Sequence, residues 1–343
     1  MASAPDRTGP RAPRIRDVAA RAGVGVGTVS RVLNDAPGVA DATRERVRAV
    51  MDELGYRPSS TARNLSLGRT LTLGVIAPFF TSPSVVERLR GIDDVVGDSP
   101  YDLTLFNIET LEHRKAALRR FARRSKVDGV VVISLPLTAA EVRALERDGL
   151  PAVCIDVANA PLPFVAIDDV EGGAIATDHL LEAGHARVAF VGDVKHASFG
   201  FDSSERRLEG FASALREAGV ALPRGYVKRG PFGRESASRL ARELLALGRR
   251  PTAVFAASDV QAFGVLDAAA RAGLAVPEDL SVIGFDDIEL AAAIGLTTVR
   301  QPLRESGQLG ARLLLSALDG GAPTPPALPE LTVVTRRTVA APA

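Results

Sequence analysis

The chain has 343 residues, of which 46% are hydrophobic, so it is long enough for two or three domains with substantial cores. Its formal net charge is only +1, yet residues 1–70 hold 12 arginines, no lysine and 7 acidic residues, whereas the remainder holds 30 basic and 34 acidic residues. The single cysteine excludes a disulfide framework, and the absence of any apolar run of roughly 20 residues excludes a transmembrane helix.

The first 13 residues, MASAPDRTGPRAP, are polar and rich in proline, which predicts a disordered leader. The leader has no apolar core and does not match a secretory signal, so we expect a cytoplasmic protein with no membrane partner. The net charge of +5 over residues 1–70 favours contact with a polyanion. A generally high arginine content would explain the same charge, so a motif has to decide between the two.

Three short amphipathic helices are predicted over residues 15–22, 28–34 and 43–56. Gly23 ends the first helix, and the second follows almost at once. Two short helices joined by a glycine-containing turn and backed by a third are typical of an all-α helix-turn-helix head, which we place at residues 14–58. The apolar faces of the three helices comprise Ile15, Val18, Ala19, Ala22, Val29, Val32, Leu33, Val47, Val50, Met51 and Leu54.

The glycines of RAGVGVGTVSRVLN, residues 21–34, allow a second interpretation as a phosphate-binding loop. The dinucleotide fingerprint G-x-G-x-x-G needs a buried strand before it and a glycine at its last position. Here an amphipathic helix precedes the glycines, and Ser30 stands at the last position. The glycines therefore belong in and just after the turn between two helices, which favours DNA binding over nucleotide binding.

In a helix-turn-helix the second helix enters the major groove of double-stranded DNA, and its first residues meet the base edges. Val26 is suited to contact a thymine methyl group there. Arg31 can donate to O6 and N7 of guanine together, although a solvated charge on the helix surface is the alternative. The predicted DNA-binding residues of this helix are Val26, Gly27, Thr28, Ser30, Arg31 and Asn34.

The combination of D-V-A-x-x-A-G-V, T-V-S-R-V-L-N and Y-x-P at these spacings closely resembles the DNA-binding head of the LacI/GalR family of bacterial transcription regulators. The resemblance implies that residues 59–70 form a hinge helix that orders on the operator. In that hinge, Leu65, with Arg63 before it, matches the residue that wedges into the minor groove. On its residues alone, such a polar stretch is more often an ordinary linker.

From residue 71 to residue 343, short apolar runs alternate with helical segments, which predicts parallel sheets covered on both faces. There are enough runs for two doubly wound parallel-sheet subdomains. We expect crossovers between the two near residues 157–168, 286–302 and 328–338. This α/β body resembles the periplasmic-binding-protein architecture that the family uses to recognise effectors, with the ligand between two lobes.

Polar residues follow several of the predicted strands, where ligands of such sheets bind. Carboxylates and a planar guanidinium suit a polyhydroxylated ligand, so we expect a sugar or sugar derivative. Asp259 is the exception, because it precedes a helical segment and is predicted to cap that helix. By resemblance, the residues that match effector-contacting positions are Asp156, Arg207, Ser258, Asp286 and Gln301.

The chain departs from the family pattern at several positions. Gly25 replaces the usual serine cap of the second helix, and at the third helix Ala40 replaces a serine, so Asp41 is expected to cap instead. Residues 82–85, SPSV, lack the phenylalanine that stacks on a sugar in many members, although Phe79 and Phe80 lie nearby. The identity of the effector therefore cannot be transferred from relatives.

Nothing in the chain indicates catalysis, a metal or a cofactor. The four histidines lack metal-ligand spacing, and Cys154 lies in an apolar run typical of a core. We expect a homodimeric transcriptional repressor whose affinity for a palindromic operator is controlled by its effector; no leucine heptads indicate a tetramer. A corepressor-dependent regulator and an activator stay open. A sugar-binding transport protein would not need residues 14–65, and a nucleotide-dependent enzyme would need the fingerprint.

Overall fold

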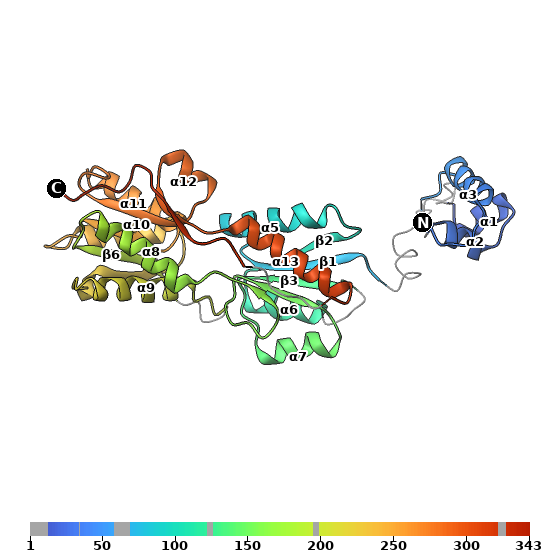
Figure 1. The fold of residues 1–343 in the computed structure, drawn as a ribbon, viewed down its shortest axis with the longest axis horizontal. Coiled ribbons are helices and arrows are strands. Elements are labelled where there is room, and N and C mark those ends of the chain that lie inside the picture. The colour runs from blue at the N-terminus through green and yellow to red at the C-terminus, as the bar shows by residue number, and fades with distance from the viewer. Residues whose placement is uncertain (1–12, 34, 58–68, 122–125, 195–198, 322–326) are drawn as a thin grey trace, which may run out of the picture. The chain divides into compact units, whose positions relative to one another are not determined.

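The computed structural model of the protein divides into two compact units, residues 1–71 and 72–343, which are described separately (Figure 1). The structure describes the whole chain except residues 1–12, 34, 58–68, 122–125, 195–198 and 322–326. Within the described ranges, no helix is both long and apolar enough to cross a bilayer.

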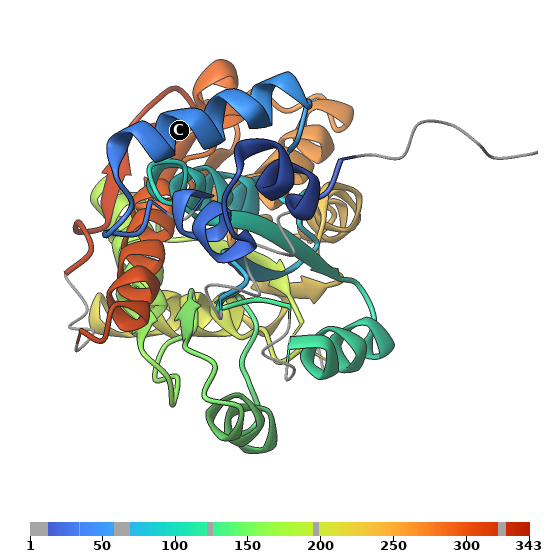
Figure 2. The same cartoon turned by 90° about the vertical axis from the view of Figure 1, so that its right-hand side faces the viewer.

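The N-terminal unit consists of α1 (Ile15–Ala22), α2 (Val26–Leu33) and α3 (Asp41–Glu53), drawn in blue in Figure 2. Gly23 ends α1 in the left-handed conformation, with a φ of 68°, and lets the chain turn directly into α2. The three helices share one small core, which confirms the predicted helix-turn-helix. This core contains Val18, Ala19, Ala22, Val29, Val32, Val47, Val50 and Tyr56.

The expected cap at the start of α3 is wrong. Asp41 is the first residue of the helix rather than its cap. The capping residue is Ala40, whose side chain makes no hydrogen bond to the helix. Asp35 instead accepts hydrogen bonds from Arg44 and Arg48 of α3, each at 2.9 Å. These bonds hold the turn before α3 against the helix. At α2, the Gly25 carbonyl accepts the first backbone bonds of the helix, as expected for a capping position.

The first sheet of the second unit has the strand order β2–β1–β3–β4–β5, and all its strands are parallel. These strands are β1 (Thr72–Pro78), β2 (Asp102–Ile108), β3 (Gly129–Ile133), β4 (Ala152–Ile155) and β5 (Phe164–Val165). Two helices pack on each face, α5 (Pro83–Val96) with α13 (Leu303–Leu318), and α6 (Leu111–Phe121) with α7 (Ala139–Arg147) (Figure 1). Cys154 is buried in this lobe, and burial raises the pKa of its thiol to about 12.

The second sheet has the order β11–β10–β9–β8–β6–β7, in which only β11 is antiparallel. Its strands are β6 (Val188–Asp193), β7 (Val227–Gly230), β8 (Ala253–Ala256), β9 (Ser281–Asp286), β10 (Thr297–Arg300) and β11 (Thr332–Val334). The helices of this lobe are α8 (Asp169–Glu182), α9 (Ser203–Glu217), α10 (Arg234–Leu245), α11 (Asp259–Arg271) and α12 (Glu289–Ile294).

Both faces of the second sheet are buried, because alternate residues of a strand enter different cores. Phe190 packs with α8 and α9, whereas Ala189 and Val191 pack with α10 and α11. The predicted pair of doubly wound subdomains is therefore confirmed. We call them lobe 1 (β1–β5 with α5, α6, α7 and α13) and lobe 2 (β6–β11 with α8–α12).

The chain passes between the lobes three times. It leaves β5 for α8 at residues 166–168, leaves β10 for α13 at residues 301–302, and returns from α13, which ends at Leu318, to β11, which begins at Thr332. The second passage carries Gln301 across between the two sheets. These connections join the β5 edge of the first sheet to the β10 and β11 side of the second, so polar residues at the ends of the neighbouring strands lie beside them.

Helices α5 and α13 run side by side in direct backbone contact (Figure 1). A β-carbon added at Gly307 would lie 2.1 Å from the carbonyl oxygen of Arg88, and one added at Gly91 would lie 1.9 Å from that of Arg304. Only glycine fits at either position without a shift of the backbone. This contact fixes where α5, and the Arg88 side chain with it, lies relative to α13.

Candidate functional site

The site begins at the carboxyl ends of two neighbouring strands in lobe 1. Ser134 follows β3 and Asp156 follows β4, both with positive φ, 50° and 63°. The Ser134 hydroxyl donates to Asp156 Oδ2 over 2.6 Å. Non-glycine residues rarely adopt positive φ, and here it turns two polar side chains across the sheet edge toward each other.

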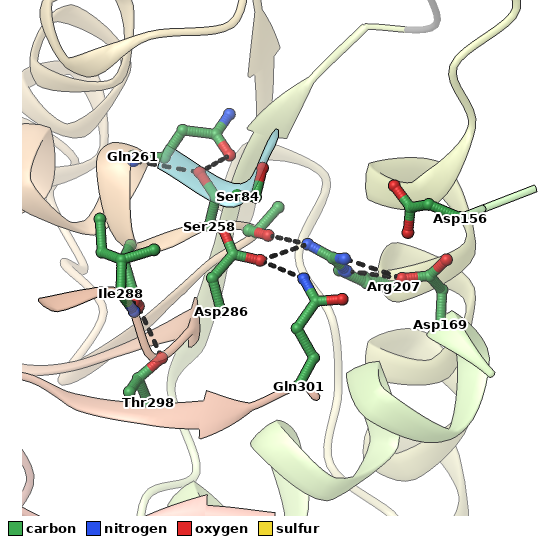
Figure 3. Close-up of polar contacts among 12 residues, drawn as sticks. Ser84, Asp156, Asp169, Arg207, Ser258, Gln261, Asp286, Ile288, Thr298 and Gln301 are labelled. Carbon is green, nitrogen blue, oxygen red and sulfur yellow. Dashed lines mark hydrogen bonds and ion pairs between the residues drawn. The ribbon is translucent and has the colours of Figure 1, made fainter. Parts of the chain in front are cut away.

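Arg88 of α5 carries the network from lobe 1 to the crossover. Its Nη2 donates to Asp156 Oδ1 over 2.7 Å and to Gln301 Oε1 over 3.2 Å, although the arginine is only 3% exposed. Gln301 in turn donates from Nε2 to Asp286 Oδ1 (Figure 3). An unbroken chain of hydrogen bonds therefore runs from the end of β3 in lobe 1 to the end of β9 in lobe 2.

Arg207 of α9 organises the lobe 2 side. Its Nε and Nη2 lie 2.9 and 2.8 Å from Asp169 Oδ1, and its Nη1 donates to the Ala257 carbonyl over 2.6 Å. Nη1 also lies 3.9 Å from Asp286 Oδ1, and the guanidinium carbon is 3.7 Å from the centre of the Phe285 ring. Figure 3 shows Arg207 between Asp169 and Asp286. Its charge is thus shared between two buried carboxylates and an aromatic face.

Asp286 is the carboxylate at the centre of this arrangement. Burial raises its pKa to about 6, against the opposing attraction of Arg207 and Arg88 and the hydrogen bond from Gln301, while the negative charge of Asp156 raises it further. Burial likewise raises the pKa values of Asp169 and Asp193. The interior between the lobes therefore holds more carboxylates than its two arginines neutralise.

Protonation of Asp286 should stabilise the folded protein. Because its folded pKa of about 6 exceeds the ordinary 3.8, the folded state disfavours the charged form, and this penalty is lost as the pH falls through 6 toward 4. We expect Asp286→Asn to remove a gain on the order of 2 kcal/mol between pH 7.5 and 4.5, measured by urea unfolding. The comparison with the unmodified chain cancels the opposite contribution of His179 and His185, whose pKa values are lowered. Parallel pH profiles for the two proteins would contradict this role.

The structure gives the cap predicted for Asp259 to Ser258 instead. Ser258 caps α11, because its hydroxyl accepts from the Gln261 N–H over 3.2 Å and pairs with Gln261 Oε1 over 3.0 Å. Asp259 does not cap the helix: it is the first helical residue and accepts from the Ile288 N–H and the Thr298 hydroxyl. The β8–α11 turn directs the serine to the helix end and buries the aspartate under β10.

The predicted effector residues come from separated segments, and four of them belong to one network. Asp156, Gln301, Asp286 and Arg207 are linked in that order, the first pair through Arg88 and the last pair as an ion pair at 3.9 Å. Ser258 follows β8, next to Ala257, whose carbonyl Arg207 bonds. A cavity of about 310 Å³ opens beside Asp286 and Gln301, lined further by residues of α5, α12 and α13.

Sequence reasoning missed Arg88, Asp169, Asp193 and Gln261. Gln261 donates to Asp193 Oδ1 over 3.5 Å, at the end of β6. Arg88 had a signal in the sequence: it lies three residues after Val85 and four before Ile92, both buried, and therefore on the inward face of α5. An arginine on an apolar helix face needs a buried partner, and Asp156 provides it.

The predicted DNA-contacting residues lie on α2 and partly outside the described residues. Val26 is 42% exposed, and Gly27 and Arg31 are also exposed, whereas Thr28 and Ser30 are half-buried. The side chains of Val29 and Val32 point into the core instead. Asn34, Arg63 and Leu65 fall outside the described residues. In the part of the chain that is described, no cluster of histidine, cysteine and acidic residues could hold a metal ion.

Two family models match the chain. Residues 14–59 match the model described as bacterial regulatory proteins of the lacI family, and residues 177–339 match that of a periplasmic binding protein-like domain. Among the curated relatives, an HTH-type transcriptional repressor PurR from Photobacterium profundum is 35% identical over 307 residues, which are 88% of this chain and 90% of that protein.

Solved structures give the same result over nearly the whole chain. The structure of a transcriptional regulator CelR–cellobiose complex is 31% identical, with a TM-score of 0.70, and the match covers 95% of this chain and 99% of that one. The lac repressor dimer bound to operator and the anti-inducer ONPF is 28% identical, with a TM-score of 0.84, and the match covers 96% and 100% of the two chains.

Proposed function

This chain belongs to the LacI family of bacterial transcriptional regulators. From this premise we propose that it is a repressor whose affinity for a palindromic operator is controlled by a sugar-like effector bound between its lobes. It is a DNA-binding regulator and not an enzyme. The observation that carries the proposal is the hydrogen-bonded network Asp156–Arg88–Gln301–Asp286, which joins strand ends of both lobes through a crossover residue.

For DNA, we propose that residues 14–58 bind the major groove with α2 and that residues 59–70 form the hinge. The exposed Val26 and Arg31 would contact base edges, and Thr28 and Ser30 would contact phosphates or bases. Asn34, Arg63 and Leu65, outside the described residues, complete the proposed set. In the proposed homodimer, which residues 71–343 form, the two DNA-binding heads are related by two-fold symmetry. They therefore match the two half-sites of a palindromic operator.

For the effector, we propose contacts with Asp156, Arg207, Ser258, Asp286 and Gln301. Two guanidinium groups, Arg88 and Arg207, face the carboxylates of Asp156, Asp169, Asp193 and Asp286. This excess of carboxylates accepts hydroxyl hydrogen bonds and repels anions. The proposed effector is therefore a neutral polyhydroxylated molecule and not a sugar phosphate. The cellobiose complex of a 31% identical regulator supports a sugar.

Effector and operator are coupled in this proposal through the lobes. A ligand that binds Asp286 and Asp156 competes for the bonds that Gln301 and Arg88 now make, and so changes which arrangement of the lobes is most stable. By linkage, an effector that weakens operator binding is itself bound more weakly by the operator complex, by the same factor.

A selection of random duplex DNA by the full-length protein tests the proposal. We expect one palindrome to be enriched at near-physiological salt, and this enrichment to be lost with a pool of neutral sugars but kept with their 6-phosphates. No enriched sequence would contradict the DNA role, and a palindrome unaffected by the sugars would contradict the effector class. A palindrome bound more tightly with sugar would make the effector a corepressor.

Arg31 is the sharpest point of the DNA interface to test. We expect Arg31→Ala to weaken binding to the selected palindrome by about 1–3 kcal/mol, roughly five- to 150-fold, in a fluorescence anisotropy titration. Arg31→Lys should keep the salt dependence but lose discrimination at one base pair, since lysine cannot bond guanine in a planar fork. Arg46→Ala removes the same charge from α3 as a control. Equal losses for Arg31→Ala and Arg46→Ala would show that only charge matters.

A further inference from the structure

The order of the strands places two kinds of residue at opposite ends of the facing sheet edges. In lobe 1, Asp156 follows β4 and Ser134 follows β3, whereas Phe79 and Phe80 follow β1. In lobe 2, polar Gln301, Asp286 and Ser258 follow β10, β9 and β8, whereas Val194 and Phe232 follow β6 and β7. The polar end lies beside the crossovers, and the other end of each edge carries large apolar side chains, with Asp193 as the last residue of β6.

The apolar ends of the two lobes lie together. Phe199 belongs to the segment between β6 and α9 of lobe 2, yet it is buried in a lobe 1 core with Leu135 and Val157. Its ring centre lies 5.9 Å from that of Phe79, edge to face, and the Phe201 ring lies 6.4 Å from Phe79. The segment that follows β6 therefore meets the end of β1, and β7 lies next to β6 in the lobe 2 sheet.

Large apolar side chains at this end are unusually exposed: Phe79 by 42%, Phe80 by 37%, Val194 by 47% and Phe232 by 54%. Each comes within two residues of a strand end, where a ligand of this fold binds. Exposed apolar side chains that gather on one surface mark a binding site more often than side chains that are exposed singly. Aromatic faces pack against the apolar C–H face of a sugar ring, whose hydroxyls remain in water.

The row of strand ends in the lobe 2 sheet is also long. From β10 to β7 it spans four strand spacings, about 19 Å at roughly 4.8 Å each. Gln301, Asp286 and Ser258 occupy the half from β10 to β8, and Val194 and Phe232 occupy the other half beside Asp193. A single small ring bound to the polar half would leave Phe80 and Phe232 uncovered.

We propose that the effector is a saccharide of at least two linked rings, with one ring held by the polar residues and the next packed on Phe79, Phe80 and Phe232. This proposal rests on the proposed function, because it assigns the class of sugar to the same cleft. It makes Phe80 and Phe232 specificity-determining residues that contact only the second ring. The polar residues then recognise what a monosaccharide and its disaccharides share.

Calorimetric titration of the full-length protein with matched sugars tests the proposal. The probes are glucose with cellobiose and maltose, galactose with lactose, and xylose with xylobiose. We expect at least one disaccharide to bind tenfold or more tightly than its own monosaccharide. A monosaccharide that binds as tightly as its disaccharides would overturn the inference and leave the proposed function intact. Binding of no sugar, with the palindrome still selected, would overturn both the inference and the sugar effector.

Variants at the aromatic end separate the second ring from the first. We expect Phe80→Ala and Phe232→Ala to weaken binding of the best disaccharide about five- to tenfold and to leave its monosaccharide unchanged. Leu105→Ala is the control, because Leu105 is 40% exposed in the middle of β2, away from the strand end. An equal loss for monosaccharide and disaccharide would overturn the assignment. So would a shift in sedimentation without a change in sugar binding, which would make this surface a contact between copies of the chain.

Discussion

Replacing Arg207 by methionine is expected to destabilise the second unit by about 3–5 kcal/mol and to abolish its response to the effector. The methionine side chain matches much of the volume but leaves the buried carboxylates of Asp169 and Asp286 without their shared cation. Removing one partner of a buried ion pair costs far more than the pair itself contributes, since an unpaired charge remains in a low-dielectric interior. Urea unfolding at pH 7.5 measures the loss.

The neighbouring Arg206 provides the matched control. Its side chain is 30% exposed and lies 3.3 Å from Asp168, which is itself mostly exposed. Exposed ion pairs contribute about 0–1 kcal/mol, so Arg206→Met should stay within that range. A second variant isolates the cause: adding Asp169→Asn to Arg207→Met should recover part of the lost stability, because it removes one of the unpaired charges. Equal losses for Arg207→Met and Arg206→Met would contradict the role of Arg207 as the shared cation.

Gly307→Ala is expected to destabilise the same unit by about 1–3 kcal/mol and to impair effector binding. The added methyl group would meet the Arg88 carbonyl at 2.1 Å, so α5 must move away from α13. This loss outweighs the gain of about 0.5–1 kcal/mol that alanine gives in a helix. Because Arg88 moves with α5, its bonds to Asp156 and Gln301 should lengthen. Thermal unfolding and sugar titration measure the two effects.

Gly248→Ala serves as the control for this substitution. No atom lies within 4 Å of a β-carbon added at Gly248, so its replacement should leave both stability and sugar binding unchanged. If Gly307→Ala is as stable as Gly248→Ala, the α5–α13 contact tolerates a methyl group. In that case, helix spacing does not position Arg88.

The two variants affect opposite ends of one network. Arg207 lies on α9 in lobe 2 and Arg88 on α5 in lobe 1; Asp286 and Gln301 connect them, and Arg88 also bonds Asp156. When Arg207 is removed or Arg88 is displaced, buried carboxylates are left without a counter-charge. In the proposed mechanism, the same carboxylates accept the hydroxyl groups of the effector, so the groups that stabilise the free protein are those that recognise the ligand.

The sequence alone predicted the helix-turn-helix, because its signals are local. Apolar residues at helical spacing recur on α1, α2 and α3, and Gly23 allows the left-handed turn between the first two helices. The same holds for the two parallel sheets, whose strands are short apolar runs between amphipathic helices. Even so, local patterns assigned the caps wrongly: Asp41 and Asp259 look like caps in the sequence, but neither caps its helix.

Part of the candidate site was also accessible from the sequence. Asp156 and Asp286 stand directly after or at the end of apolar strands, where parallel sheets place their ligands. Arg207 and Gln301 entered the prediction through resemblance to the family. Asp169 and Gln261 did not enter it, since no short-range pattern distinguishes them from ordinary residues of α8 and α11. Arg88 did not enter it either, although its place on the apolar face of α5 was a signal.

The sequence by itself thus determined the elements, the fold class and which strands end in polar residues, because these depend on periodicity over a few neighbouring positions. Only the tertiary structure decided which charges meet. Arg88 and Gln301 are 213 positions apart and bond within a buried crossover, and Arg207 and Asp169 are 38 apart. Such pairs form because a charge taken out of water must find a partner in space, and spatial neighbours follow from how helices pack, not from their order in the chain.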